Sequence, residues 1–199
     1  MRPKTLLEMS GAAASPATLA TATIVVIDAQ REYVDGKLAL PEVGPALAEI
    51  RSLLERARKA QAPIVHVQHR GRPSGAFGPD TAGFIIADEA APQGGEAVVE
   101  KNLPNAFAGT NLKAKLDALG RKEIILAGFM THMCVEATAR AAIDHGLKAT
   151  VVAAATATRD LPDPLTGGAV PAAEVHRNAL TAMADRFATI VADSKSIPD

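Results

Sequence analysis

Hydrophobic residues along the chain fall into short continuous runs, separated by stretches with a one-sided apolar pattern. The runs are rich in β-branched residues, which is typical of strands buried on both faces of a parallel sheet. Four strong runs are TIVVID (23–28), PIVHVQ (63–68), EIILAG (123–128) and ATVVAA (149–154), and two weaker ones are AVVE (97–100) and ATIVA (188–192). This pattern predicts a sheet of about six strands.

Between these runs, apolar residues recur at steps of three and four, the spacing of one face of an α-helix. The expected helices cover residues 43–57, 110–120, 131–146 and 171–187. Thr110 and Thr131 are candidate N-caps, because a hydroxyl can accept from the free N–H groups of a first helical turn. The alternation predicts an α/β fold: an open, mostly parallel sheet with helices on both faces.

The whole chain, residues 1–199, is long enough for one hydrophobic core and is predicted to form a single domain. Residues 1–20 precede the first strand and are expected to be an N-terminal extension. Two stretches rich in Gly and Pro, 69–96 and 158–170, are longer than ordinary connections. We interpret both as candidate active-site loops.

Composition narrows the class of function. The formal net charge of −1 and the aromatic content of 3% argue against a nucleic-acid or membrane partner. No apolar run reaches the ~18 residues of a membrane span, and the N-terminus lacks the apolar centre of a signal peptide. The single cysteine cannot form an internal disulfide. We therefore expect a soluble, cytoplasmic protein that acts on a small molecule.

Three reactive side chains follow predicted strands. Asp28 follows TIVVI, Lys101 follows AVVE, and Cys134 lies shortly after EIILAGFM. Ligands of open α/β sheets bind beyond the carboxyl ends of the strands, so these side chains are expected at one edge. There the lysine would favour the thiolate and the carboxylate would transfer protons.

The position of Cys134 fits two interpretations. As a lone cysteine it could be a small buried packing residue. As a residue in the first turn of a helix, it could be a nucleophile, because the free N–H groups and the helix dipole there favour a thiolate and could hold an oxyanion. Position alone favours neither.

The histidines do not indicate a metal site. Zinc needs three or four ligands at defined spacing, and residues three apart in a strand, such as His66 and His69, point to opposite faces. We predict no bound metal and no cofactor. Neither a glycine-rich phosphate loop nor a GxSxG elbow is present in the sequence.

Three motifs, in order, resemble those of the isochorismatase-like cysteine hydrolases, which include nicotinamidase, N-carbamoylsarcosine amidase and ureidoacrylate amidohydrolase. The motifs are VVIDAQREY, VEKNLPNAFAGTNL and LAGFMTHMCVEATARAA. The resemblance extends from about residue 23 to residue 192. It implies a Rossmann-like isochorismatase fold and a homo-oligomer, either a dimer or a tetramer.

The resemblance also implies a catalytic triad of Asp28, Lys101 and Cys134. A cis peptide bond between Phe129 and Met130 is implied as well, and it would aim the N–H of Met130 alongside that of Cys134 as an oxyanion hole. The candidate substrate-binding residues are Gln30, Tyr33, His69, Phe107, Thr131 and His132. For Arg70 and Arg72, binding of a substrate carboxylate and simple solvation of a loop are equally good interpretations.

Two departures from the superfamily narrow the function. Nicotinamidases carry an Asp-x-His metal motif after the second strand, whereas this chain reads VHVQHRGR and only His69 could match. True isochorismatases usually lack a nucleophilic cysteine. The resemblance therefore implies an amidohydrolase that cleaves a small amide, carbamoyl or ureido substrate through a thioester and releases ammonia or an amine. The alternatives are a vinyl-ether hydrolase with Asp28 as acid, and a non-catalytic binding or scaffold protein.

Overall fold

The computed structural model describes residues 2–11 and 15–199. The expected N-terminal extension therefore lies partly outside the described residues, at residue 1 and residues 12–14. Its described part contains a short helix, α1 (Leu6–Met9), which lies beside α5 (Ala172–Arg186). The Leu6 N–H donates to Asp185 of α5 at 2.9 Å.

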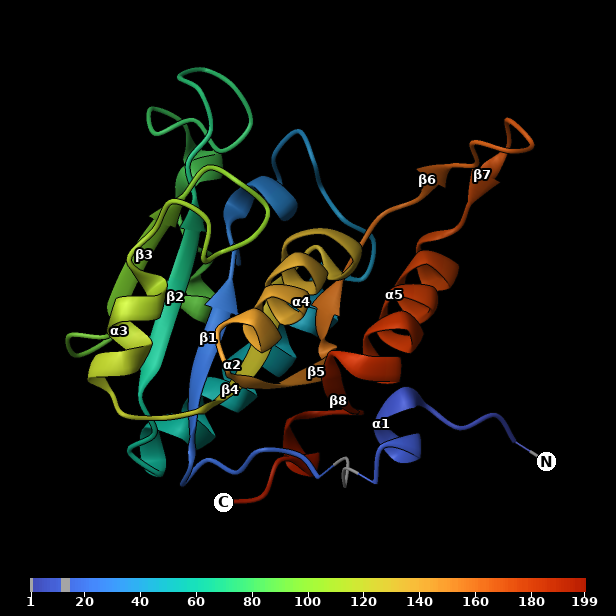
Figure 1. Cartoon of the computed structure of the whole chain (residues 1–199). Coiled ribbons are helices and arrows are strands. Elements are labelled where there is room, and N and C mark those ends of the chain that lie inside the picture. Colours follow the sequence, from blue (N-terminus) through green and yellow to red (C-terminus); the bar gives the residue numbers. More distant parts are fainter. Residues whose placement is uncertain (1, 12–14) are drawn as a thin grey trace.

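A six-stranded parallel sheet runs through the centre of the molecule (Figure 1). Its strands, in spatial order, are β3 (Ala97–Lys101), β2 (Ile64–His69), β1 (Ala22–Ile27), β4 (Glu123–Phe129), β5 (Lys148–Ala157) and β8 (Ala188–Val191). This confirms the predicted α/β class and the strand number. The largest difference is at β5, which continues three residues beyond its predicted run at 149–154.

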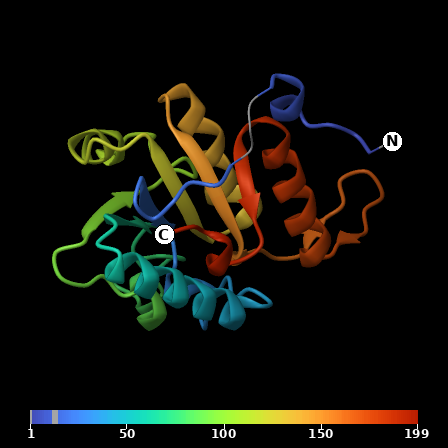
Figure 2. The same cartoon turned by 90° about the horizontal axis from the view of Figure 1, so that it is seen from below.

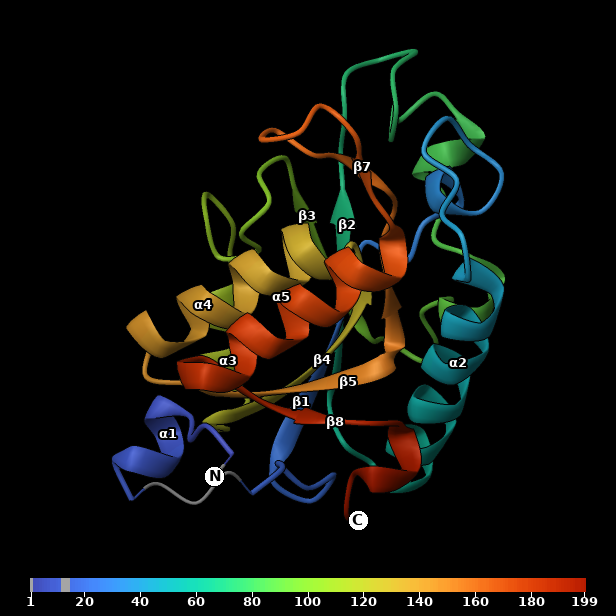
Figure 3. The same cartoon turned by 90° about the vertical axis from the view of Figure 1, so that its right-hand side faces the viewer.

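Helices cover both faces of the sheet. Figure 3 shows α2 (Val43–Lys59) on one face, and α3 (Leu112–Ala118), α4 (Glu136–Asp144) and α5 on the other. Seen from below in Figure 2, the strands lie between α2 and the layer of α4 and α5. Successive side chains of β1 point to opposite faces of the sheet. Ile24 belongs to the hydrophobic cluster between the sheet and α2, and Val25 belongs to the cluster between the sheet and the helices of the other face.

The segment expected to be one helix at 131–146 is divided. A single π-helical turn, Thr131–Val135, precedes α4. Thr131 is not an N-cap, because its hydroxyl is hydrogen-bonded to His176 Nδ1 at 2.9 Å. At α3, the N-cap position is occupied by Asn111 and not by Thr110, although Thr110 Oγ1 accepts the Leu112 N–H at 3.2 Å.

The two candidate loops have structure of their own. The stretch 69–96 contains two short 3₁₀ turns, Ala82–Phe84 and Asp88–Ala90. The stretch 158–170 contains an antiparallel hairpin of β6 (Leu161–Pro162) and β7 (Ala169–Val170), which projects from the carboxyl end of the sheet (Figure 1). Two-residue strands carry no readable pattern, which is why the sequence did not predict this hairpin.

Candidate active site

Four neighbouring strands contribute to one polar cluster. Lys101 and His69 are the last residues of β3 and β2, Asp28 follows β1, and Cys134 lies in the turn after β4. These strands are adjacent in the order β3-β2-β1-β4, so their carboxyl ends meet at one edge. The fold thus brings together the three residues expected to form the triad, and adds His69.

Lys101 lies at the centre of this cluster. Its Nζ is 2.6 Å from Asp28 Oδ2, 3.1 Å from His69 Nδ1 and 3.3 Å from Cys134 Sγ. The side chains of Lys101 and Asp28 are fully buried, and Cys134 is only 4% exposed. Because water does not screen these groups, their charges interact strongly.

The donor atoms of Asp28, His69 and Cys134 lie within 4.8 Å of one another, which is a spacing that could suit a metal ion. All three side chains, however, contact Lys101 Nζ. The ammonium already supplies positive charge at the centre of the donor set, and a divalent cation there would meet a like charge at short range. The donor set therefore fits an ammonium better than a metal ion.

Two of the three titratable partners of Lys101, Asp28 and His69, have pKa values shifted in opposite directions. Burial raises the pKa of Asp28 to about 6, although Lys101 opposes this. Its Oδ1 is buried and has no hydrogen-bond partner among the described residues. Burial, then the Lys101 charge, lower the pKa of His69 to about 4, so the ring is neutral near pH 7. Because His69 Nδ1 accepts from the ammonium, its proton is on Nε2.

Cys134 is a thiol in the resting cluster. Burial raises its pKa to about 12, the Asp28 carboxylate adds to this, and Lys101 opposes it. Lys101 thus favours the thiolate, as expected, but burial and the Asp28 charge act in the opposite direction and are stronger. The carboxyl group next to this thiol is that of Asp28, whose pKa lies close to neutrality.

The backbone is constrained on both sides of the cluster. Asp28 has a φ of 50°, in the left-handed region that few non-glycine residues adopt. Gly128 has a φ of 114°, and a Cβ there would lie 1.9 Å from the Ile27 carbonyl oxygen, so only glycine fits. Shortly after Gly128, the peptide bond between Phe129 and Met130 is cis.

Gln30 has a positioning role in the structure. Its Nε2 donates to the carbonyl oxygens of His69 and Phe84 at 3.0 and 2.8 Å, and its Oε1 accepts the His69 N–H at 2.7 Å. The side chain is fully buried. With both amide N–H groups engaged, Gln30 fixes the end of β2 and is not available to a substrate, contrary to the sequence-based expectation.

Tyr33 lies beside the cluster. Its ring packs edge-on against Phe77 and Phe129, with centroids 5.0 and 5.6 Å apart. Burial, and then the nearby Asp28 and Cys134, raise the pKa of Tyr33. The Tyr33 hydroxyl is thus neutral and within electrostatic reach of the thiol.

Thr131 and His132 connect the nucleophile turn to two residues that the sequence analysis did not place at the site. Thr131 is bonded to His176 of α5, as described above, and His132 Nδ1 lies 2.5 Å from Thr158 Oγ1. Thr158 directly follows β5, so the rule about carboxyl ends of strands could have found it. His176 lies within α5 and gives no such signal.

Phe107 lies away from the cluster. Its ring packs against the His145 ring with a centroid distance of 4.5 Å. His145 follows the C-terminus of α4, whereas Cys134 precedes its N-terminus. The structure therefore contradicts the expected contact of Phe107 with substrate and makes it a core residue.

A buried acid also went unrecognised. The Glu32 carboxylate accepts the Lys37 N–H at 2.7 Å and the Phe77 N–H at 3.2 Å. It thereby joins the segment after β1 to the loop 69–96, beside Tyr33. In sequence, Glu32 reads as a surface residue of a polar stretch, because its partners are distant backbone groups.

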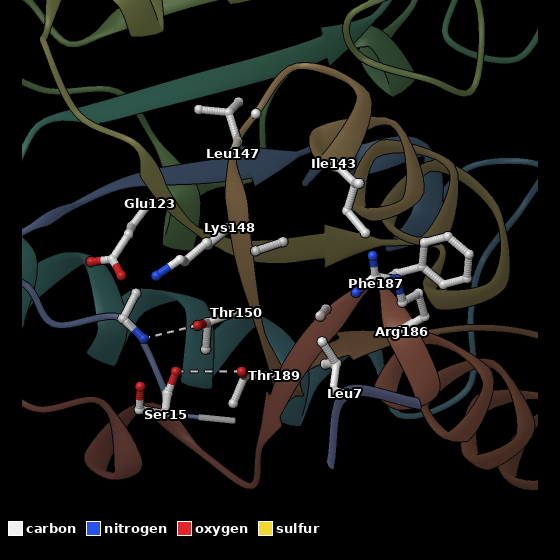
Figure 4. Close-up of a pocket in the computed structure, with 14 residues that line it drawn as sticks. Leu7, Ser15, Glu123, Ile143, Leu147, Lys148, Thr150, Arg186, Phe187 and Thr189 are labelled. Atoms are coloured by element: carbon white, nitrogen blue, oxygen red, sulfur yellow. Dashed lines mark hydrogen bonds between the residues drawn. The ribbon is translucent and has the colours of Figure 1, made fainter. Parts of the chain in front are cut away.

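A large cavity lies at the opposite edge of the sheet. It has a volume of about 510 Å³ and is lined by Glu123, Lys148 and Ala188, the first residues of β4, β5 and β8 (Figure 4). The polar cluster is at the carboxyl ends of the strands, so this cavity belongs to a different region of the molecule.

Known proteins share this sequence and fold. The isochorismatase domain model matches residues 22–194, which include the whole cluster. A secreted isochorismatase effector of Verticillium dahliae is 42% identical over 95% of this chain and 96% of its own length. A streptothricin hydrolase of Streptomyces noursei is 38% identical over 88% of this chain and 63% of its own length.

The likeness extends to solved structures. An isochorismatase from Pseudomonas putida has a TM-score of 0.93 and 40% identity, over 98% of this chain and 100% of that one. No helix within residues 2–11 and 15–199 is long and apolar enough to cross a membrane. A cytoplasmic location stays a prediction, since the Verticillium relative is named as secreted. The domain match and the high identity over nearly the full length show that this chain is a hydrolase of the isochorismatase family.

Proposed function

We propose that this enzyme is a cysteine-dependent amidohydrolase that cleaves a C–N bond in a small amide, carbamoyl or ureido compound. One observation carries the proposal: the ammonium of Lys101 contacts both a buried thiol, that of Cys134, and a carboxyl group with a pKa of about 6, that of Asp28. The names of two similar proteins, streptothricin hydrolase and N-carbamoylsarcosine amidase, support hydrolysis of such a bond.

In the first half of the reaction, Asp28 takes the thiol proton and the Cys134 sulfur attacks the carbonyl carbon. This proton transfer moves the negative charge from Asp28 to the sulfur, where Lys101, 3.3 Å away, stabilises it. The C–N bond then breaks while Asp28 returns the proton to the nitrogen. Ammonia or an amine leaves, and the acyl group remains on sulfur as a thioester.

In the second half, a water molecule takes the place of the leaving group. Asp28, again a carboxylate, accepts a proton from this water as its oxygen attacks the thioester carbon. The C–S bond breaks, the sulfur regains the proton from Asp28, and the acid product leaves. A single carboxyl group serves both halves because its pKa lies close to neutrality.

The backbone N–H groups of Met130 and Cys134 are proposed to hold the oxyanion formed at the carbonyl. The turn that carries them is fixed, because the Met130 carbonyl accepts the N–H groups of Met133 and Val135 at 3.0 and 3.3 Å. Loss of one such donor typically costs ~100- to 1000-fold in rate.

The test compares wild type with Cys134→Ala on a panel of small amides and ureido acids, with ammonia release as the readout. We expect Cys134→Ala to lose turnover and keep its circular dichroism spectrum and melting temperature. Mass spectrometry of quenched wild type should show an acyl adduct on Cys134. Ammonia release that persists in Cys134→Ala would contradict the proposal. A vinyl-ether hydrolase would instead tolerate Cys134→Ala on isochorismate and fail with Asp28→Asn.

A further inference from the structure

The nucleophile turn is hydrogen-bonded to α5 and to the end of β5, neither of which contributes a residue to the polar cluster. This turn is the π-helical segment after β4 that carries Cys134. Its first residue, Thr131, is fully buried, and Thr131 Oγ1 lies 2.9 Å from His176 Nδ1 of α5. The next residue, His132, is bonded to Thr158 at 2.5 Å. The turn is therefore held from two sides by side chains of other elements.

His176 has a rigid support. Val175, Ala179 and Met183 form the buried stripe of α5, at steps of four residues. Met183 belongs to the same hydrophobic cluster as Cys134, so α5 is packed against the element that it contacts. His176 itself lines a cavity of about 540 Å³. A change of side chain at this position thus alters the wall of a cavity and not the centre of the core.

The residue before Thr131 has a free donor. Met130 lies between β4 and the turn, and its N–H donates to no acceptor within residues 2–11 and 15–199. Met130 is only 6% exposed. A buried N–H without an acceptor costs free energy, and a substrate oxygen can supply the acceptor. The carbonyl oxygen of a substrate attacked by Cys134 would be such an acceptor.

We propose that His176 is a positioning residue of the oxyanion hole. Its contact with Thr131 fixes the chain directly after Met130, and so the direction of the Met130 N–H toward the carbonyl oxygen at Cys134. Catalysis depends steeply on such a position, because a misplacement of about 1 Å can cost on the order of 100-fold in rate. The inference rests on the proposed function, because it names the residue that orients one of the two oxyanion donors.

Two pairs of variants separate the hydrogen bond from the volume of the side chains. Thr131→Val removes the hydroxyl and keeps the shape, whereas Thr131→Ser keeps the hydroxyl. His176→Leu removes the ring nitrogen, whereas His176→Asn places an amide close to the position of Nδ1. The matched control is Thr181→Val, because Thr181 is an exposed residue of α5 whose hydroxyl donates to the Arg177 carbonyl oxygen at 2.8 Å.

Two reagents distinguish the position of the donor from the reactivity of the sulfur. p-Nitrophenyl acetate acylates Cys134: the S–C bond forms at the carbonyl carbon, the thiol proton passes to Asp28, and p-nitrophenolate leaves after an oxyanion has formed. Iodoacetamide alkylates the same sulfur: the S–C bond forms at the methylene carbon, the proton passes to Asp28, and iodide leaves without an oxyanion. The readout is the ratio of the acylation rate constant to the alkylation rate constant, each corrected for the reaction of Cys134→Ala.

We expect Thr131→Val and His176→Leu to lower this ratio by about 10- to 100-fold and to change the alkylation rate by less than about twofold. Thr131→Ser and His176→Asn should recover most of the ratio, and Thr181→Val should match wild type. The double variant Thr131→Val/His176→Leu should lose no more than the more impaired single variant, because both substitutions remove the same contact.

A contact that only stabilises the fold would change both reactions together, or neither. A ratio that stays at the wild-type value in Thr131→Val and His176→Leu would therefore overturn the inference, as would a wild type that iodoacetamide alkylates and the ester does not acylate. Melting temperatures verify that each variant is folded. If Thr131→Val does not fold, the comparison of His176→Leu with His176→Asn decides, because His176 lies at the wall of a cavity.

Ammonia release from the panel of amides and ureido acids separates this inference from the proposed function. If the ratio falls as expected while wild type releases no ammonia, the proposed function fails and the positioning role of His176 stands. If release depends on Cys134 while the ratio depends on neither Thr131 nor His176, the positioning role fails and the proposed function stands. A wild type that reacts with neither reagent and releases no ammonia overturns both.

Discussion

Replacing Lys101 by methionine tests how the cluster controls its proton. The substitution removes the ammonium and keeps most of the volume, so the surrounding core retains its packing. Lys101 Nζ lies 2.6 Å from Asp28 Oδ2, and both side chains are fully buried. At an effective dielectric constant of about 20, Coulomb's law gives ~6 kcal/mol for this pair. Half of that energy is enough to raise the pKa of Asp28 from about 6 to roughly 8.

The same ammonium also stabilises the thiolate form of Cys134, at 3.3 Å, by ~5 kcal/mol on the same scale. When a proton passes from Cys134 to Asp28, the attraction of Lys101 to the carboxylate is lost and its attraction to the thiolate is gained. These two energies nearly cancel. The main effect of Lys101→Met is therefore that Asp28 is protonated at neutral pH and cannot act as base. We expect kcat/KM at pH 7 to fall by ~10-fold or more and to recover partly as the pH rises.

The assay is the pH dependence of kcat/KM for ammonia release between pH 5 and 10. Wild type should lose activity as the pH falls through about 6, because the Asp28 carboxylate becomes protonated there. The corresponding limb of Lys101→Met should lie near pH 8, and that of Lys59→Met, an exposed lysine at the end of α2, should match wild type. An acid limb that stays near pH 6 in Lys101→Met would refute this reasoning.

Three further substitutions test the framework of the site. Gly128→Ala places a Cβ 1.9 Å from the Ile27 carbonyl oxygen and should lower the free energy of unfolding by more than ~3 kcal/mol, measured in urea; wild-type stability would show that the backbone there is not confined. Gln30→Leu leaves backbone groups of His69 without partners and should cost ~2–4 kcal/mol in the same assay, with an unchanged unfolding midpoint as the contrary result. Phe107→Leu should cost ~1 kcal/mol and leave KM unchanged; a several-fold change in KM would return Phe107 to the substrate pocket.

The sequence by itself determined the framework of this protein. Short runs of β-branched residues, of the length of a strand, identified all six strands of the main sheet. Strands that are buried on both faces need continuous apolar side chains. The rule that ligands bind at the carboxyl ends of parallel strands brought Asp28, Lys101 and Cys134 to one edge. The motif resemblance identified the family, which the domain match confirms.

Only the tertiary structure decided what each side chain near the cluster does. Gln30 and Phe107 looked equally suited to touch a substrate, yet distant backbone groups engage the first and His145 packs against the second. The protonation of Cys134 depends on burial, which no local pattern reveals. Burial and hydrogen bonding are set by segments far apart in sequence, and these are the quantities on which the chemistry depends.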